Sequence, residues 1–211
     1  MRASLLAAER EARSGSFAND PRAVFVLTAR APQFDSQSAF PKHVGPLLVF
    51  EPADLEGEQA WRVLGLGEAA RIDATGPRRI ATLKDAGTAL FANLRERREP
   101  GCDDVSAPRL YGGLGFTPRE ESSTVDDAWR DFPDASFALP RWLLLSRGEH
   151  HFVQLAVHAA TLREQGSAPL LAELDAIERA QAGAPKISAN SALELSELPP
   201  QAWRSLVEDA L

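Results

Sequence analysis

Residues 136–159, SFALPRWLLLSRGEHHFVQLAVHA, constrain the fold more than any other stretch of this chain. Two runs of large apolar and β-branched residues flank a short polar turn, SRGEH, which contains a glycine. This pattern predicts a β-hairpin whose two strands are largely buried. Because an isolated hairpin is only marginally stable in water, further strands must lie beside it and other elements must cover it.

The rest of the chain supplies partners for this hairpin. With 211 residues, the chain can bury a core without needing disulfides or a metal. Further strands are expected at residues 23–29, 47–52, 60–67 and 109–116, and amphipathic helices at residues 2–13, 78–98, 169–182 and 199–211. The strands at 47–52 and 60–67 are expected to form a second hairpin. Hairpins mixed with helices predict an α+β fold, a largely antiparallel sheet flanked by helices.

Composition divides the chain into three parts. Residues 1–183 are expected to form one α+β scaffold domain, followed by a linker of small and polar residues at 184–198 and by the start of a further helix at 199–211. The apolar positions of that helix continue to the last residues without a capping glycine or a closing proline. We therefore expect the sequence to be the N-terminal portion of a protein roughly twice as long.

Charge and cysteine content narrow the classes of function. The formal net charge is −7, and the longest basic cluster, residues 95–98, contains Glu96 and precedes Glu99. We interpret this cluster as the solvated end of a helix, so nucleic acid is not an expected partner. The single cysteine, Cys102, excludes an internal disulfide and fits the cytoplasm. No apolar run reaches the roughly 18 residues of a membrane span, and an early Glu9 argues against a secretory signal.

Two glycine-rich stretches could be mistaken for nucleotide-binding loops. GLGEAA, residues 65–70, matches a dinucleotide-binding pattern, but too few residues follow it to form the helix that such a site needs. YGGLGF, residues 111–116, is followed by Thr117 and Pro118 rather than by a helix. We interpret Gly112, Gly113 and Gly115 as a device for close packing, because glycines in a strand mark a bulge or a near neighbour.

The histidines do not form a metal site by sequence logic. His150 and His151 are adjacent, so on a strand they point to opposite faces. His150 and His158 share a face but lie about 26 Å apart along a strand. His43 lies in a proline-rich loop and could approach the others only through the fold.

The remaining reactive residues give no catalytic group either. Cys102 precedes Asp103 and Asp104, and nearby carboxylates raise the pKa of a thiol rather than activate it. Acidic pairs such as residues 126–127 lie in turn-like segments, and Glu173 has no suitable neighbour in the sequence. We therefore assign no catalytic, cofactor-binding or metal-binding residue to this chain.

Several segments together resemble the N-terminal half of chorismate-utilising enzymes, most of all isochorismate synthases. The segments are GGLGF at 112–116, Trp129 with Phe132, and FALPR at 137–141. WRVLGLGEAARI at 61–72 resembles a glycine-rich strand of the same half, and AWRSLVEDAL at 202–211 resembles the helix that opens the catalytic half. Nothing in residues 1–60 resembles the inhibitor-binding segment of the anthranilate-producing branch.

The resemblance implies an isomerase that converts chorismate to isochorismate with Mg²⁺, in menaquinone or siderophore biosynthesis. In the family, the catalytic and Mg²⁺-binding residues follow the opening helix, so this chain would be an inactive scaffold that binds neither Mg²⁺ nor chorismate by itself. Its exposed apolar face would be covered by the missing half or by self-association. The alternatives are a stand-alone binding or regulatory module, and part of an anthranilate, aminodeoxychorismate or salicylate synthase.

Overall fold

The computed structural model describes residues 1–14, 20, 22–34, 47–50, 60–115 and 133–182. Within these ranges one sheet contains seven strands: β1 (Val24–Arg30), β2 (Leu47–Phe50), β3 (Arg62–Ala74), β4 (Leu94–Arg98), β5 (Tyr111–Leu114), β6 (Ala135–Arg147) and β7 (His150–His158). The helices are α1 (Arg2–Arg13), α2 (Arg79–Ala92), α3 (Ala159–Gln165) and α4 (Ala168–Ala182). The strand order is β2-β3-β6-β7-β1-β4, and β5 pairs with β6. Every pairing except that of β1 with β4 is antiparallel, which confirms the predicted α+β fold class.

The predicted hairpin is the centre of the sheet. β6 and β7 pair from Trp142 with Leu155 to Arg147 with His150, and Gly148 occupies the turn with a φ of +57°. A left-handed backbone of this kind favours glycine, which explains the glycine in the polar turn. The hairpin predicted between the strands at 47–52 and 60–67 is also confirmed, because β2 and β3 pair antiparallel.

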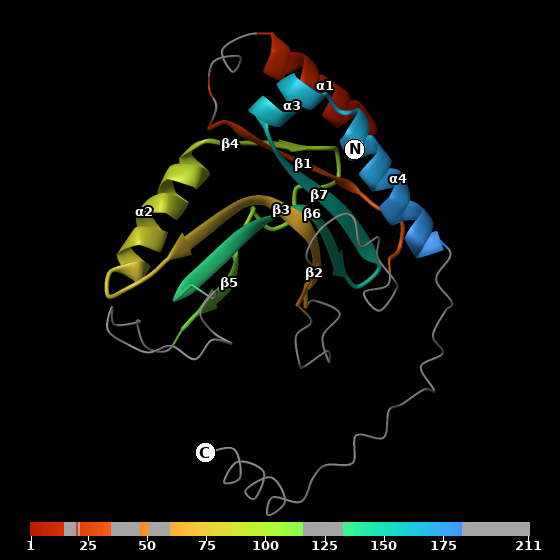
Figure 1. The fold of residues 1–211 in the computed structure, drawn as a ribbon. Coiled ribbons are helices and arrows are strands. Elements are labelled where there is room, and N and C mark those ends of the chain that lie inside the picture. Colours follow the sequence, from red (N-terminus) through yellow and green to blue (C-terminus); the bar gives the residue numbers. More distant parts are fainter. Residues whose placement is uncertain (15–19, 21, 35–46, 51–59, 116–132, 183–211) are drawn as a thin grey trace, which may run out of the picture.

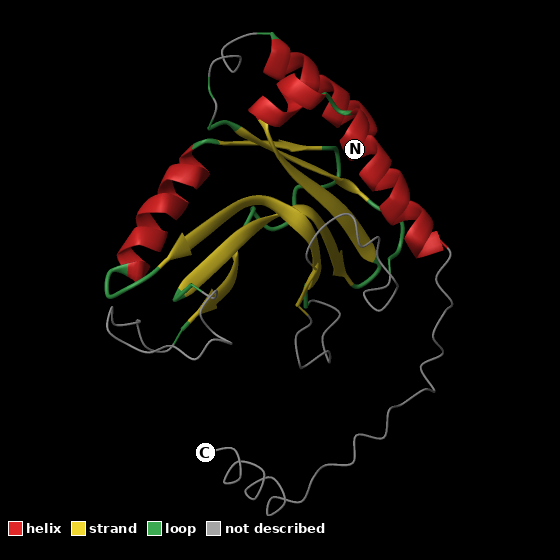
Figure 2. Ribbon diagram, viewed as in Figure 1, coloured by secondary structure: helices red, strands yellow, loops and turns green. Residues whose placement is uncertain are grey.

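One face of the sheet carries the main core. Phe25, Leu27, Trp142 and Leu155 have no exposed surface there. Helices α1, α3 and α4 gather against this side, whereas α2 lies on the other (Figures 1 and 2). Helix α1 buries Leu5, Ala8 and Ala12, and α4 buries Leu170, Leu174 and Ile177, so both predicted helices present one apolar stripe to the sheet. Each fully buried large side chain contributes roughly 1.5–3 kcal/mol.

A carboxylate connects α1 to the turn between α3 and α4. Glu9 accepts a hydrogen bond of 3.0 Å from the backbone N–H of Ser167 and pairs with Arg13 at 2.9 Å. The turn contains Gly166, whose φ is +72°. Hydrogen bonds from the side chain and, to a smaller extent, the backbone of Ser167 lower the pKa of Glu9, so these contacts favour the charged carboxylate.

The predicted helix at 78–98 is wrong at its C-terminal end. Helix α2 ends at Ala92, and residues 94–98 form β4, a parallel edge strand beside β1. Arg97 lies over the ring of Phe25, with 5.7 Å from its guanidinium carbon to the ring centroid, and pairs with Glu11. Arg98 donates hydrogen bonds to the backbone carbonyls of Asp103 (3.0 Å) and Val105 (2.6 Å). The basic cluster is therefore a strand held by tertiary contacts, not a solvated helix end.

Two further elements differ from the expected boundaries. β3 continues through EAARIDA to Ala74, with a bulge between Glu68 and Ala70, so no crossover helix follows the glycine pattern. The short helix α3 connects β7 to α4 and was not expected. The linker at 184–198 and the helix at 199–211 lie outside the described residues.

Candidate functional site

The three strands that carry the recognisable motifs lie side by side. Phe137 on β6 pairs with Ile72 on β3 along one edge and with Gly112 on β5 along the other. The FALPR segment is thus the middle strand, between the glycine-rich strand β3 and the double-glycine strand β5. Residues far apart in the chain form one patch of the sheet.

Two glycines in this patch allow close approach of neighbouring strands. A Cβ atom on Gly112 would press against the carbonyl oxygen of Ser136 and lie 2.6 Å from the Cα atom of Phe137. A Cβ atom on Gly65 would lie 3.2 Å from the ring of Pro140 and 3.3 Å from Leu48. The packing interpretation is confirmed at Gly112, and Gly65 is similarly confined by its neighbours. The interpretation is wrong at Gly113, which is exposed and would place a Cβ atom in open space.

The patch contains a cavity of about 190 Å³, here named the glycine hollow. It is lined by Leu48, Gly65, Gly67, Glu68, Arg71, Tyr111, Gly112, Ser136, Ala138 and Pro140. All three motif strands and β2 contribute to it. Five of the ten lining residues are glycine, alanine or serine, so the backbone of the sheet contributes to the wall of the hollow.

Two polar groups give the glycine hollow its chemical character. Arg71 forms a bidentate pair with Glu68, in which Nε donates to Oε2 at 3.0 Å and Nη2 donates to Oε1. Hydrogen bonding to Glu68 raises the pKa of Arg71, and burial raises the pKa of the Tyr111 phenol. Tyr111 is thus a neutral hydroxyl and Arg71 a cation at neutral pH. These groups can hold a polar ligand, but the lining contains no nucleophile with an adjacent base.

Arg71 and Tyr111 are site residues that the sequence analysis did not select. Tyr111 stands directly before the double glycine, and Arg71 belongs to the stretch after GLGEAA. Both positions lie in or next to the segments that resemble the family. The alternation of side chains between the two faces of each strand was the signal that could have identified them.

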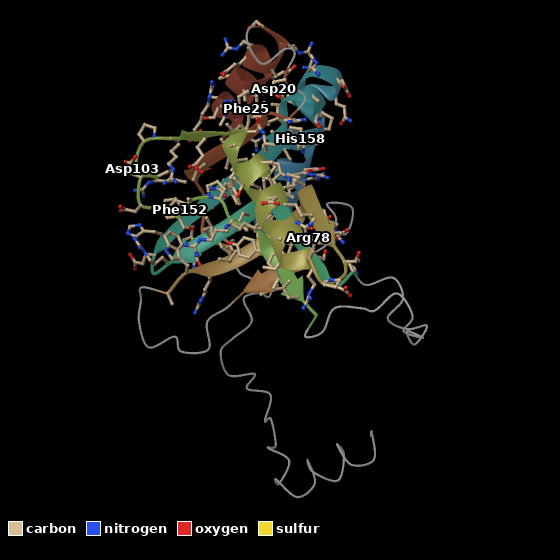
Figure 3. The ribbon with its side chains drawn as sticks, turned by 90° about the vertical axis from the view of Figure 1, so that its left-hand side faces the viewer. Asp20, Phe25, Arg78, Asp103, Phe152 and His158 are labelled. Atoms are coloured by element: carbon tan, nitrogen blue, oxygen red, sulfur yellow. The ribbon has the colours of Figure 1, made fainter. Side chains whose placement is uncertain are left out.

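The three described histidines all lie on β7. His150 is exposed at the hairpin turn, and His158 ends β7 beside α3, where Figure 3 labels it. The Nδ1 atom of His151 is buried without a hydrogen-bond partner, and the ring meets Phe34 edge-on at a centroid distance of 5.4 Å. Burial lowers the pKa of His151, and the charge of His150 lowers it further. His43 lies outside the described residues.

In the part of the chain that the structure describes, no group of three or more histidine, cysteine or carboxylate side chains is placed to hold a metal ion. Two of the described carboxylates, Glu68 and Glu173, are already engaged, the first by Arg71 and the second by Arg141 and Trp142. The described residues therefore do not fit a Mg²⁺ site.

Cys102 is a buried core residue. It packs with Val63, Leu145 and Phe152 and has no exposed surface. Burial raises the pKa of its thiol, and the charges of Glu99 and Asp103 raise it further. The sequence analysis predicted that nearby carboxylates raise the pKa of this thiol, and they do, but burial is the larger cause of the increase. Trp129, Phe132 and the acidic pair at 126–127 lie outside the described residues.

Comparison with known protein families matches residues 30–211 to the chorismate binding enzymes. The match covers most of the chain, and the chain belongs to this family. It includes all the segments that carried the resemblance, which is confirmed at the level of the family. No curated protein matches the chain. No helix within the described ranges is long and apolar enough to cross a membrane.

Proposed function

We propose that this chain is the N-terminal scaffold of an isochorismate synthase and that the complete enzyme converts chorismate to isochorismate in the cytoplasm. Membership of the chorismate binding enzymes supports the substrate. The observation that carries the proposal is the adjacency of the three motif strands, with Phe137 paired between Ile72 and Gly112. These strands bear the segments that resemble the isochorismate branch most closely.

The reaction is an isomerisation. Water adds to one ring carbon of chorismate, and hydroxide leaves from another, so that no atom is gained or lost overall. By the resemblance, Mg²⁺ assists this chemistry in the complete enzyme, and menaquinone or siderophore synthesis uses the product. We assign no step to the metal, because the described residues do not fit it.

In this proposal the described residues support the reaction without performing it. The close contacts at Gly65 and Gly112 hold β3, β5 and β6 in one rigid layer. The glycine hollow lets a second layer, which carries the catalytic groups, approach the backbone of this layer closely. Arg71 and Tyr111 are the polar contacts that the hollow offers to it.

An apolar groove on α2 is a second surface that we propose the catalytic half covers. The groove has a volume of about 730 Å³ and is lined by Leu83, Lys84, Gly87, Thr88, Phe91, Ala92, Leu110 and Phe137. Phe91 is 39% exposed there, and Ile80 on the same helix is 61% exposed. Exposed apolar groups gathered on one helix are typical of an interaction surface.

The test is turnover of chorismate with Mg²⁺ by the protein expressed from its complete gene, with products separated by liquid chromatography. We expect isochorismate as the product, and no turnover by residues 1–211 alone. Anthranilate, aminodeoxychorismate or salicylate as the product would contradict the isochorismate assignment while preserving the family. Absence of turnover by the complete protein would instead favour a binding or regulatory module. Turnover by residues 1–211 would contradict the scaffold role.

A further inference from the structure

The central sheet divides at one point. Along one edge, β6 pairs with β5 from Ala135 to Ala138 and with β7 from Trp142 to Arg147. Residues 139–141 lie between these two ladders and pair with neither strand on that edge. β7 continues past Leu155 to His158 with β1 as its partner. The strands β6 and β7 therefore separate beyond the pair formed by Trp142 and Leu155, and they leave a fork in the sheet.

A cavity of about 250 Å³, here named the fork pocket, lies at this division. Residues of β3, β6, β7, α3 and α4 line it. The side chains that can donate hydrogen bonds into it are those of Arg141, His158, Thr161 and Gln165. The volume is slightly below the range of roughly 300–1,000 Å³ that is usual for ligand pockets, so a ligand here must be small.

Both carboxylates that line the fork pocket already have partners. Glu173 accepts a hydrogen bond of 2.7 Å from Nη1 of Arg141 on one oxygen and another of 2.7 Å from Nε1 of Trp142 on the other. Glu68 is held by the two-point contact with Arg71. Because these negative charges are compensated, they oppose an incoming anion much less than bare carboxylates would.

The donors, in contrast, are largely unused. A guanidinium has five N–H groups, and in the described part of the chain Arg141 contacts a single hydrogen-bonded partner, Glu173. The side chains of His158 and Thr161 have no hydrogen-bond partner among the described residues. The cavity is therefore lined by N–H and O–H groups that are free to donate, and the Arg141 guanidinium among them is a donor only. A ligand that supplies acceptors would satisfy these groups.

We propose that the fork pocket binds a small organic anion through a carboxylate, which Arg141 holds and to which His158 and Thr161 donate further hydrogen bonds. A carboxylate matches the planar fork of a guanidinium and forms charge-assisted hydrogen bonds with it. This proposal does not depend on the proposed isomerisation and is tested independently of it. Glu68 lines both the fork pocket and the glycine hollow, so the two sites are neighbours through one residue.

The experiment is a titration of the ¹⁵N-labelled 211-residue chain with malonate, followed by NMR, with acetate and inorganic phosphate as comparison anions. The chain carries a formal charge of −7, which keeps nonspecific binding of anions low. We expect saturable shifts at the amides of Ala156, Thr161 and Gln165 and at the ring of His158. The dissociation constant should be of the order of 1 mM, as befits a single charged contact. Tighter binding of phosphate than of malonate would contradict the assignment to a carboxylate.

Three variants test the location. Arg141→Gln should weaken binding of malonate about tenfold or more, and Thr161→Val about threefold, because each removes a donor. Arg62→Gln, which removes an exposed arginine elsewhere on β3, should leave the affinity unchanged and controls for total charge. Thr161→Val leaves the contacts of Glu173 intact, so it stays informative if Arg141→Gln fails to fold. Shifts centred on Gly65 and Gly112, unaltered affinity in Thr161→Val, or no saturation by about 50 mM malonate would overturn the proposal.

Discussion

Gly112 on β5 lies directly against the backbone of Phe137 on β6, so closely that a Cβ atom at position 112 would be 2.6 Å from the Phe137 Cα atom. No side chain fits between these strands without moving one of them. The contact joins the double-glycine motif to the FALPR motif, and it accounts for the glycine at this position.

Gly112→Ala should therefore destabilise the fold. Because the added methyl group meets backbone rather than a flexible side chain, we expect the free energy of unfolding to fall by about 3 kcal/mol. Gly113→Ala is the matched control, since a Cβ atom there has open space, and it should change stability by less than about 0.5 kcal/mol. Urea unfolding followed by tryptophan fluorescence measures both. Equal effects of the two substitutions would contradict the close-packing interpretation.

Glu173→Ala should destabilise the contact between α4 and β6. The substitution leaves Nε1 of the fully buried Trp142 without its 2.7 Å acceptor, and an unsatisfied buried donor costs about 1–3 kcal/mol. The pair with Arg141 is partly buried, and its loss adds to this cost. Glu164→Ala, at an exposed position on α3, is the control and should be nearly neutral. Differential scanning calorimetry of both variants provides the comparison, and an unchanged melting temperature for Glu173→Ala would refute the assigned role.

His151 should make stability depend on pH. Burial lowers its pKa in the folded chain below the ordinary value of 6.5, which the unfolded chain retains. Between the two pKa values the unfolded state binds more protons, so the free energy of unfolding rises with pH across that interval. Above pH 6.5 the stabilising contribution of the neutral His151 has reached its full value. His151→Gln should flatten this rise. Urea unfolding from about pH 5 to about pH 8 measures the slope.

The control for this prediction is His150→Gln, which removes the adjacent exposed histidine at the turn. It should keep most of the slope, because burial is the larger cause of the lowered pKa of His151 and the charge of His150 is the smaller. If both variants retain the full slope, another group is responsible.

Cys102 should be nearly unreactive in the folded chain. Its side chain has no exposed surface, and burial raises the pKa of its thiol, so little thiolate is present at neutral pH. We expect modification by a thiol-specific disulfide reagent to be at least tenfold slower than in denaturant, on the order of what protection in a folded core gives. The chain has one cysteine, so the colour released reports this residue alone. Equal rates in buffer and in urea would contradict its burial.

The apolar groove on α2 should promote association of residues 1–211 when they are isolated. Replacing Ile80 and Phe91 together by glutamine removes two of the exposed apolar side chains and should increase the monomer fraction. Light scattering coupled to size-exclusion chromatography measures the mass. The control replaces Leu6, an exposed leucine on α1, by glutamine, and it should leave the mass unchanged. A strictly monomeric parent chain would remove the basis for a covered surface.

The motif segments around the candidate site could be identified from sequence, but its polar residues and its geometry could not. The segments 61–72, 112–116 and 137–141 were selected because they resemble a family, and the close packing expected of the glycines in 112–116 is present at Gly112. Their adjacency depends on pairing between strands that are distant in the chain, which no local pattern encodes. The pairing of Arg71 with Glu68 depends on the extension of β3 beyond the bulge at Glu68, which the sequence did not predict.

The sequence by itself determined the elements whose signals are local: the central hairpin with its glycine turn, the apolar stripes of α1 and α4, and the mixed, mainly antiparallel class of the fold. Only the tertiary structure decided that residues 94–98 form a parallel edge strand. Their alternating charges predict a solvated helix end, and that preference is overridden by pairing with β1, by the stacking of Arg97 on Phe25 and by the hydrogen bonds from Arg98 to the following loop. Local propensities differ by fractions of a kcal/mol per residue, roughly, whereas several such long-range contacts together outweigh them.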